Sequence, residues 1–377
     1  MLGVAAVHLV VGWLYSSGFR RDALTIRQRA DDPEILVREL SNDTITLEAP
    51  RPRQDIGHPG TLGLYWDGGY SQVNDVVDVR DGKVLRLFTH LKGELPPLCP
   101  DGSLDTCQAV SLGSYAFPDN PADVGLDFRE IEYTSPLGAM GGWTIESGST
   151  RWTLHIHGWG AHRREALRLL PPINAEGWNS LVIDYRNDED APTDPSGHYR
   201  FGLSEWEDVE AAVAQLSAMG ATDIVLVGYS TGAAHAMAFL ERSELADKVG
   251  GLVFDSPNIN LASTVRHGSR GARLPFVRIP LTRLMIEFGM WISDLRWKVD
   301  WVATNYLERA PETIGVPILV FHGSADRRVP VAVSRTLADM LGGLVTYVET
   351  PAAGHVMSWN ADRERYERAL TGFLRGL

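Results

Sequence analysis

DIVLVGYSTGAAHAMAFL, residues 223–240, is the stretch of this sequence that decides the fold. It begins with an apolar run that is typical of a buried strand, and from Ala233 it continues into a run typical of a helix. The turn between them is Gly228-Tyr229-Ser230-Thr231-Gly232. A Gly-x-Ser-x-Gly string often arises by chance, but a strand before it and a helix after it are the context in which such a turn exposes a serine hydroxyl above a sheet. The stretch therefore predicts Ser230 as a nucleophile.

A serine hydroxyl is a weak nucleophile, so it needs a base that a third group orients. We expect His355 as the base and Asp326, which follows an apolar run at 317–321, as the acid. The chain order serine, acid, histidine is the one that accompanies such turns. The alternatives are a helix-capping Asp326, an ordinary loop histidine at His355, and Asp255 as a competing acid. Asp326 is preferred because His355 lies on the loop that follows it.

The charge that forms on an attacked carbonyl needs hydrogen-bond donors that are already in place. We expect two backbone N–H groups, that of Thr231 at the start of the helix and that of Trp159 in the glycine-containing loop at 157–160. Tyr229, beside the serine, and Trp291, in a later aromatic segment, are expected to contact the substrate.

Two histidines on the first core strand raise the alternative of a metal site. His155 and His157 would face the same way on a strand, as metal ligands do. A two-histidine site needs further ligands, and the residues that follow, through His162, lack the carboxylate expected of a two-metal hydrolase. We therefore expect no metal and no other cofactor.

After about Phe128, apolar strands alternate with helical stretches. This pattern predicts an α/β fold, a mostly parallel sheet with helices on both faces, over residues 128–377. The expected strands are 152–156, 180–184, 223–227, 251–255, 317–321 and the shorter 344–347. The expected helices include 165–170, 204–219 and 233–240. Because the chain of 377 residues exceeds the usual single core of roughly 250, we expect a second, smaller unit as well.

Residues 20–127 are rich in turn residues and short alternating runs, which predicts a small β-rich domain. Its clearest unit is a hairpin over 76–88, because Asp81-Gly82 between alternating apolar runs favours a turn with positive φ at both central residues. Further short strands are expected at 44–47 and 62–65. No chemistry can be assigned to this domain.

The segment from Leu2 to Phe19 contains no charged residue and is close to the roughly 20 residues that a spanning helix needs. We expect residues 1–19 to form a transmembrane anchor, the alternatives being a cleaved signal peptide and a buried helix. The arginines that follow favour a cytoplasmic body, whereas pairing of Cys99 with Cys107 would favour the extracytoplasmic side. These arginines are Arg20, Arg21, Arg27 and Arg29.

The formal charge is −13 and no basic run interrupts it, so nucleic acid is excluded as a partner. The chain has only two cysteines, Cys99 and Cys107, in a polar, turn-rich segment. Two cysteines cannot form a disulfide framework or a four-cysteine zinc site. A single disulfide and two free thiols both remain open.

With these motifs in place, residues 128–377 resemble the α/β-hydrolase family, in particular bacterial serine hydrolases similar to serine aminopeptidases and monoacylglycerol lipases, some of them membrane-anchored. The motifs that carry the resemblance lie at 157–160, 184–187, 228–232, 255–257, 322–326 and 354–355. The resemblance implies cofactor-free hydrolysis of ester, thioester or amide bonds through an acyl-serine. Thr231 is bulkier than the residue usual after the serine, and residues 20–127 are not part of the common fold.

Residues 256–311 leave the sheet pattern, and the resemblance implies a lid there. Their apolar side chains are Phe276, Leu284, Met285, Phe288, Trp291, Ile292, Trp297, Trp301 and Tyr306. Such a lid would favour an apolar acyl group, and helices that simply pack on the core are the alternative. The leading hypothesis is hydrolysis of small-molecule carboxylic esters, some of them lipid-derived. An amidase or aminopeptidase and a non-catalytic binding protein are the alternatives.

Overall fold

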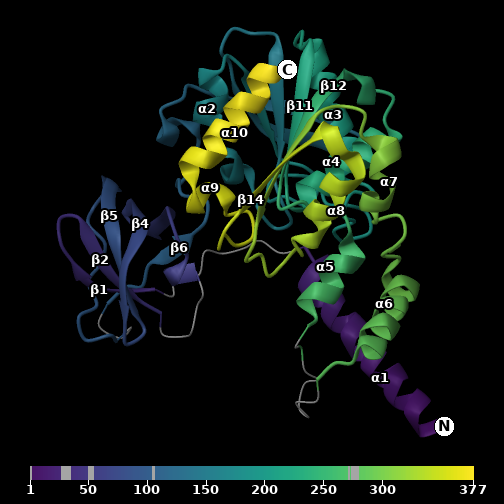
Figure 1. Ribbon diagram of the computed structural model, residues 1–377, viewed down its shortest axis with the longest axis horizontal. Coiled ribbons are helices and arrows are strands. Elements are labelled where there is room, and N and C mark those ends of the chain that lie inside the picture. The colour runs from purple at the N-terminus through teal and green to yellow at the C-terminus, as the bar shows by residue number, and fades with distance from the viewer. Residues whose placement is uncertain (1, 27–34, 50–54, 104–106, 271, 273–279) are drawn as a thin grey trace.

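The computed structural model describes the chain from Leu2 to Leu377, except for residues 27–34, 50–54, 104–106, 271 and 273–279 (Figure 1). Its main part is an eight-stranded sheet, which we call the large sheet, with the strand order β14-β13-β12-β11-β9-β10-β8-β7. These strands are β7 (Arg129–Ser135), β8 (Gly138–Ile145), β9 (Arg151–Ile156), β10 (Asn179–Ile183), β11 (Asp223–Tyr229), β12 (Val249–Asp255), β13 (Ile318–Gly323) and β14 (Val345–Thr350). The six strands β14, β13, β12, β11, β9 and β10 are parallel to one another, and β8 runs antiparallel to both of its neighbours, β10 and β7.

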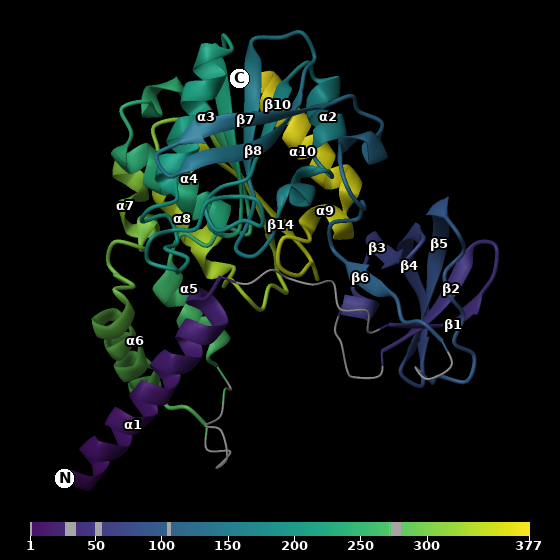
Figure 2. The same cartoon turned by 180° about the vertical axis from the view of Figure 1, so that it is seen from behind.

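Helices cover both faces of this sheet (Figures 1 and 2). One face carries α3 (Trp206–Ala218), α4 (Thr231–Arg242), α7 (Tyr306–Thr313) and α8 (Ala332–Leu341), and the other carries α2 (Leu170–Ala175), α9 (Ser358–Ala361) and α10 (Arg363–Gly376). Strand β11 shows why both faces are filled. Ile224 and Leu226 pack into the first core, and Val225 and Val227 pack into the second. Burying such a side chain stabilises the fold by ~1.5–3 kcal/mol, so an uninterrupted apolar strand requires cover on both sides.

The predicted α/β architecture is therefore confirmed, and the strands expected at 152–156, 180–184, 223–227, 251–255 and 317–321 are observed within one or two residues. The antiparallel pair β7 and β8 was not expected. Three of the eight residues of β8 are glycines, Gly138, Gly141 and Gly142, which hide the alternation of a strand.

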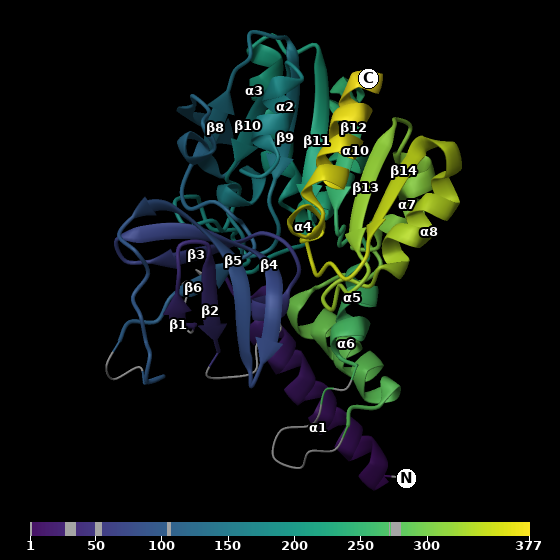
Figure 3. The same ribbon diagram turned by 60° about the vertical axis from the view of Figure 1, so that its left-hand side comes forward.

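Strands between Leu36 and Gly113 form a second, six-stranded sheet with the order β1-β2-β5-β4-β3-β6, which has its own apolar core (Figure 3). Its strands are β1 (Leu36–Leu40), β2 (Thr44–Glu48), β3 (Leu62–Trp66), β4 (Gly69–Arg80), β5 (Lys83–Gly93) and β6 (Ser111–Gly113). We call this body the small sheet. The expected hairpin is confirmed, since β4 and β5 pair around Asp81 and Gly82, whose φ angles are 52° and 78°.

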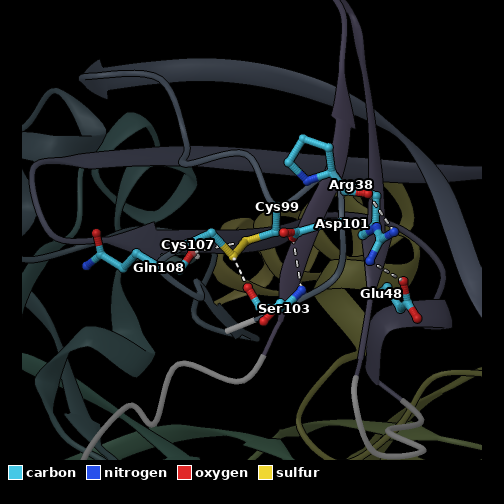
Figure 4. Close-up of a disulfide and its surroundings, with 8 residues drawn as sticks. Arg38, Glu48, Cys99, Asp101, Ser103, Cys107 and Gln108 are labelled. Carbon is cyan, nitrogen blue, oxygen red and sulfur yellow. Dashed lines mark hydrogen bonds and ion pairs between the residues drawn. A yellow bond between two sulfur atoms is a disulfide. The ribbon is translucent and has the colours of Figure 1, made fainter. Parts of the chain in front are cut away.

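Cys99 and Cys107 form a disulfide, with Cα atoms 5.4 Å apart (Figure 4). The segment is attached to β1, because Cys99 N–H donates to the Val37 carbonyl at 2.7 Å and Arg38 donates to the Pro100 carbonyl at 2.8 Å. Of the two alternatives that the spacing left open, the disulfide is the one observed.

The expected transmembrane anchor is wrong. Residues Leu2–Phe19 do form a helix, α1, but no helix in the described part of the chain is long and apolar enough to cross a membrane. The C-terminal half of α1 instead packs along α6 (Arg283–Trp297) (Figure 1). Ser16 Oγ accepts the indole N–H of Trp297 at 3.0 Å, and Ser17 Oγ accepts from Arg296 at 2.9 Å. Without the anchor, the arguments from the arginines and from the disulfide for one side of a membrane no longer apply. Two of those arginines, Arg27 and Arg29, lie outside the described residues.

The insertion between β12 and β13 contains α5 (Leu261–Gly268), α6 and α7. Helix α5 lies near the carboxyl ends of the parallel strands, whereas α6 extends away from the sheet beside α1 (Figures 1 and 3). Phe276, one of the apolar residues expected in a lid, lies outside the described residues.

Candidate active site

Ser230 occupies a tight turn between β11 and α4. Its φ of 51° and ψ of −112° are strained for a residue with a side chain, and such strain persists only where the surroundings enforce it. The two flanking glycines explain the turn. A Cβ on Gly232 would lie 1.9 Å from the Ile156 carbonyl oxygen, and one on Gly228 would lie 2.7 Å from Ala233. Only glycine fits at either position, so the backbone can bend and present the serine hydroxyl.

Three predicted residues meet at the carboxyl ends of parallel strands, the edge where sites of open α/β sheets form. Ser230 follows β11, Asp326 follows β13, and His355 follows β14. His355 Nε2 lies 2.9 Å from Ser230 Oγ, and His355 Nδ1 lies 2.7 Å from Asp326 Oδ2. The histidine therefore bridges the hydroxyl and the carboxylate.

Asp326 is held as a carboxylate by its neighbours. Burial opposes its ionisation, but the nearby charge of His355 and hydrogen bonds from His322 and His355 outweigh burial and keep the pKa of Asp326 well below its usual range. Its Oδ1 also accepts the backbone N–H groups of Arg328 and Val329 at 2.8 and 2.9 Å. The side chain is fixed and charged before it contacts the histidine.

Asp255, the competing acid, has a different environment. It is buried at the end of β12, where burial raises its pKa to about 6, and it accepts a hydrogen bond from Ser256 Oγ at 3.1 Å. The carboxylate that contacts His355 is Asp326.

Hydrogen bonds hold the loop after β9 on its buried side. Gly158 N–H donates to Glu165 Oε2 at 2.8 Å. The Gly158 carbonyl accepts from Tyr185 Oη at 3.2 Å, from His157 Nδ1 at 3.0 Å and from Ala161 N–H at 3.1 Å. Gly158 and Trp159 both line the pocket described next.

A pocket of about 910 Å³ opens onto Ser230, Thr231 and His355. We call it the central pocket. One group of its lining residues is mostly apolar and comes from α1, the following helical turn Arg20–Leu24, α5 and two loops: Phe19, Ala23, Trp159, Phe201, Leu261 and Val265. A second group is more polar and includes residues of the small sheet and its connection: Tyr65, Ser111, Ser114, Tyr115, His162 and Arg164.

Two expected substrate contacts are not in this lining. The Tyr229 side chain is fully buried, and its hydroxyl lies 3.1 Å from His155 Nδ1. It points into the core because side chains alternate along β11. Trp291 is 52% exposed on α6 and packs on Phe288 at 5.2 Å between ring centroids. Neither residue lines the central pocket, and Trp291 is kept from it because α6 runs away from the site.

The two histidines of β9 have separate protein partners. Burial lowers the pKa of His155 to about 3, and His155 Nε2 lies 3.0 Å from Thr153 Oγ1. His157 Nε2 lies 2.8 Å from Asp188 Oδ2. Burial alone would lower the pKa of His157, but the Asp188 carboxylate outweighs it and raises the pKa to about 9.

One set of side chains has metal-ligand geometry. His157, Asp188 and Asp184 offer ligand atoms within 4.8 Å of one another. In the described structure Asp188 pairs with His157, and Asp184 pairs with Arg163 at 3.0 Å. These ion pairs account for the arrangement by themselves.

Sequence reasoning missed the contribution of the small sheet, and of the connection that follows it, to the site. His58 lies next to the loop that carries His355, and Tyr65 and Tyr115 hold Arg164 at the pocket, with its guanidinium 5.0 and 5.3 Å from their ring centroids. No motif marks these residues, since the contacts join positions that are distant in the chain.

A family model described as the alpha/beta hydrolase family matches residues 154–369, more than half of the chain. An esterase from Pyrococcus furiosus is 22% identical, with a TM-score of 0.54 over 69% of this chain and 94% of that one. An esterase from Thermogutta terrifontis is 19% identical, with a TM-score of 0.47 over 66% of this chain and 98% of that one. Comparison with curated proteins found no match. The likeness to the Pyrococcus furiosus protein is a likeness of fold.

Proposed function

The chain belongs to the alpha/beta hydrolase family, and from this premise we propose that it is a serine hydrolase that cleaves carboxylic esters through an acyl-serine intermediate. One observation carries the proposal. Ser230, in a strained turn, lies within hydrogen-bond distance of His355, which in turn contacts a buried, ionised Asp326. A weak nucleophile, a base and a group that orients the base are what acyl transfer to serine requires.

In the first half-reaction, Ser230 Oγ attacks the ester carbonyl carbon while His355 Nε2 takes the hydroxyl proton. The imidazolium that forms is stabilised by Asp326, which holds Nδ1–H. When the tetrahedral intermediate collapses, His355 returns the proton to the departing alkoxide, so an alcohol leaves and the acyl group stays on Ser230. In the second half-reaction His355 deprotonates a water, which attacks the acyl carbon. As the second tetrahedral intermediate collapses, His355 gives this proton to Ser230 Oγ, so the carboxylic acid leaves and Ser230 is restored.

The tetrahedral intermediates carry a negative oxygen, and we assign its stabilisation to the backbone N–H groups of Trp159 and Thr231. In a trans peptide the carbonyl and the following N–H point in opposite directions. The Gly158 carbonyl is bound by Tyr185 and His157, both buried, so the Trp159 N–H is directed to the opposite side of that peptide. Thr231 supports the second donor because it begins α4, where N–H groups lack intrahelical partners.

The central pocket supports an ester substrate with one apolar part and one more polar part. Its volume of about 910 Å³ greatly exceeds what an acetyl group needs. The lining that includes Phe19, Leu261 and Val265 suits an aliphatic chain of the kind found in lipid-derived esters. We further propose that α5, within the insertion 256–311, serves as a wall of the pocket, in place of a lid over it.

The test is labelling with a fluorophosphonate, which reacts only with an activated serine. Wild type should label, and Ser230→Ala and His355→Ala should not. Initial rates on p-nitrophenyl acetate, butyrate and octanoate are then compared with those on the p-nitroanilides of the same acyl groups. This comparison separates esterase from amidase activity. Folding of each variant is checked by circular dichroism.

Three results would overturn the proposal. Folded wild-type protein that does not label would favour a non-catalytic binding function. Labelling that persists in Ser230→Ala would place the reactive group elsewhere. Turnover of the anilide at a rate equal to that of the ester would replace an esterase by an amidase.

A further inference from the structure

The loop that carries His355 is strained on both sides of the histidine. Ala352 and Val356 have φ angles of 58° and 53°, a region that residues with side chains avoid and that is especially unfavourable for β-branched valine. Residues in such conformations persist only when surrounding contacts enforce them, at a cost of ~1–3 kcal/mol each. The position of His355 therefore depends on what holds the loop.

Three of the contacts that hold this loop come from the large sheet and its helices. Ala352 N–H donates to Ser324 Oγ at 3.0 Å, and Val356 N–H donates to Ser256 Oγ at 3.0 Å. The Val356 carbonyl accepts from Arg168 at 2.9 Å. These contacts hold the loop before and after the histidine, and Ala325 N–H holds one side of the Ala353–Gly354 peptide by donating to the Ala353 carbonyl at 3.0 Å. None of them binds the Gly354 N–H on the other side of that peptide.

The small sheet binds this N–H group. Gly354 N–H donates to His58 Nε2 at 2.9 Å. On its other side His58 Nδ1 donates to the Pro59 carbonyl at 2.8 Å. The two bonds require the neutral tautomer with the hydrogen on Nδ1, because an acceptor nitrogen carries none.

Arg86 fixes the segment that presents His58. This arginine of β5 is fully buried, and its guanidinium donates to four backbone carbonyls, those of Ile56, His58, Gly60 and Asn74, at distances of 2.6 to 2.9 Å. Burial lowers the pKa of Arg86 to about 10. Such a buried cation binds the 56–60 segment rigidly, because each of these carbonyls accepts a charge-assisted hydrogen bond.

The next residues attach the same segment to the large sheet's helices. Thr61 N–H donates to the Asn360 carbonyl at 2.9 Å, and Asn360 Nδ2 donates to the Thr61 carbonyl at 2.6 Å. Residues 56–61 are thus fixed by Arg86 on one side and by α9 on the other, with His58 between them.

We propose that His58 is a positioning residue for catalysis: by accepting the Gly354 N–H it holds the strained loop so that His355 stays aligned with Ser230 and Asp326. Through His58 the small sheet thereby affects the rate of catalysis. The inference rests on the proposed function. His58 is not among the residues that line the central pocket, so its loss affects turnover and leaves substrate binding unchanged.

The test compares His58→Gln with His58→Asn in the full chain. Both side chains are polar amides. Glutamine reaches the position of Nε2 with its carbonyl oxygen and can accept the Gly354 N–H, whereas asparagine reaches only the position of Nδ1. We expect His58→Asn to lower kcat by about 10-fold to 100-fold, the effect of a small misalignment, with KM within about twofold of wild type. His58→Gln should retain most of kcat.

His90→Phe is the matched control, because His90 belongs to β5 of the same sheet and contacts Ser71 and Gly93 within it. It should leave kcat unchanged. Equal kcat in His58→Asn and wild type, equal losses in the Asn and Gln variants, or a loss confined to KM would each overturn the inference. Fluorophosphonate labelling of wild type but not of Ser230→Ala tests the proposed function separately, so the two failures can be distinguished.

Discussion

Asp326 contacts His355 through Oδ2 at 2.7 Å, while its Oδ1 accepts two backbone N–H groups of its own loop, those of Arg328 and Val329. The carboxylate is therefore oriented by its own loop and not by the histidine. Replacing the oxygen that faces His355 should leave the loop in place and change that oxygen's contacts with the imidazoles of His355 and His322, the second at 3.2 Å.

Asp326→Asn makes that replacement. Asparagine can keep its carbonyl oxygen on the two N–H groups and turn its NH2 group toward Nδ1, which favours the tautomer with hydrogen on Nε2. That tautomer cannot take the serine proton, so we expect kcat for p-nitrophenyl butyrate to fall by about 10⁴-fold with little change in KM. Asp255→Asn, the control, should lose less than about tenfold. Equal losses in the two variants would show that Asp326 is not the orienting acid.

The sequence predicts the large sheet well because its strands are continuous apolar runs and its key turn combines sterically required glycines with a strand and a helix. The same reasoning brings Ser230, Asp326 and His355 together, because residues at the carboxyl ends of parallel strands meet at one edge. Two of its other expectations fail. Tyr229 lies next to Ser230 in sequence but points into the core, and Trp291 is carried away by α6.

The length and apolar composition of α1 led to the wrong prediction of a membrane-spanning helix. Its lack of charge resembles a spanning segment, but Ser16 accepts a hydrogen bond from Trp297 and Ser17 accepts one from Arg296, 281 and 279 positions later in the chain. The contact between His58 and Gly354 is hidden for the same reason, since 296 residues separate them and neither belongs to a motif. Local patterns reveal strands and turns, whereas contacts between distant segments appear only in the folded chain.

The ion pair of His157 with Asp188 makes the free energy of unfolding depend on pH. The pKa of His157 is raised from 6.5 to about 9, chiefly by Asp188 acting against burial, so the folded chain holds this proton more tightly than the unfolded chain. The stabilisation is complete below pH 6.5 and is lost as the pH rises through about 9. It amounts to roughly 3 kcal/mol at most. Urea unfolding of wild type and His157→Gln from pH 6 to 10 should show their difference in free energy of unfolding shrinking over that window. A constant difference would contradict the assigned pKa.

Two substitutions at Thr231 distinguish the role of its backbone N–H group from that of its hydroxyl. Its hydroxyl is buried and has no hydrogen-bond partner among the described residues, so removing it costs little. We expect Thr231→Ala to unfold within about 1 kcal/mol of wild type and to retain kcat within about threefold, since the N–H group remains. Thr231→Pro, which lacks that N–H, should lose activity by about 100-fold or more. Strong inactivation of the alanine variant would assign the role to the hydroxyl.

The disulfide closes a short loop, with its cysteines eight positions apart. Constraining a loop of this length in the unfolded chain is worth ~2–3 kcal/mol. The double variant Cys99→Ser, Cys107→Ser should therefore unfold at lower urea than wild type. Dithiothreitol should destabilise wild type by a similar amount and have no effect on the double variant. If the reductant shifts both equally, the disulfide is not the cause.

The preference for long or short acyl chains tests whether the apolar lining of the central pocket binds the acyl group of the substrate. Val265, on α5, lines the central pocket and is only partly buried, so a larger side chain there can fill the space where an aliphatic group would lie. Val265→Phe should lower kcat/KM for p-nitrophenyl octanoate by about tenfold or more and leave the acetate rate nearly unchanged, because excluding even a few methylenes costs ~1–3 kcal/mol of transition-state binding. Trp291→Ala is the matched control from the same insertion. Since Trp291 lies outside the pocket lining, its removal should affect both esters equally or not at all. A selective loss of octanoate hydrolysis in Trp291→Ala would instead require α6 to close over the site during the reaction.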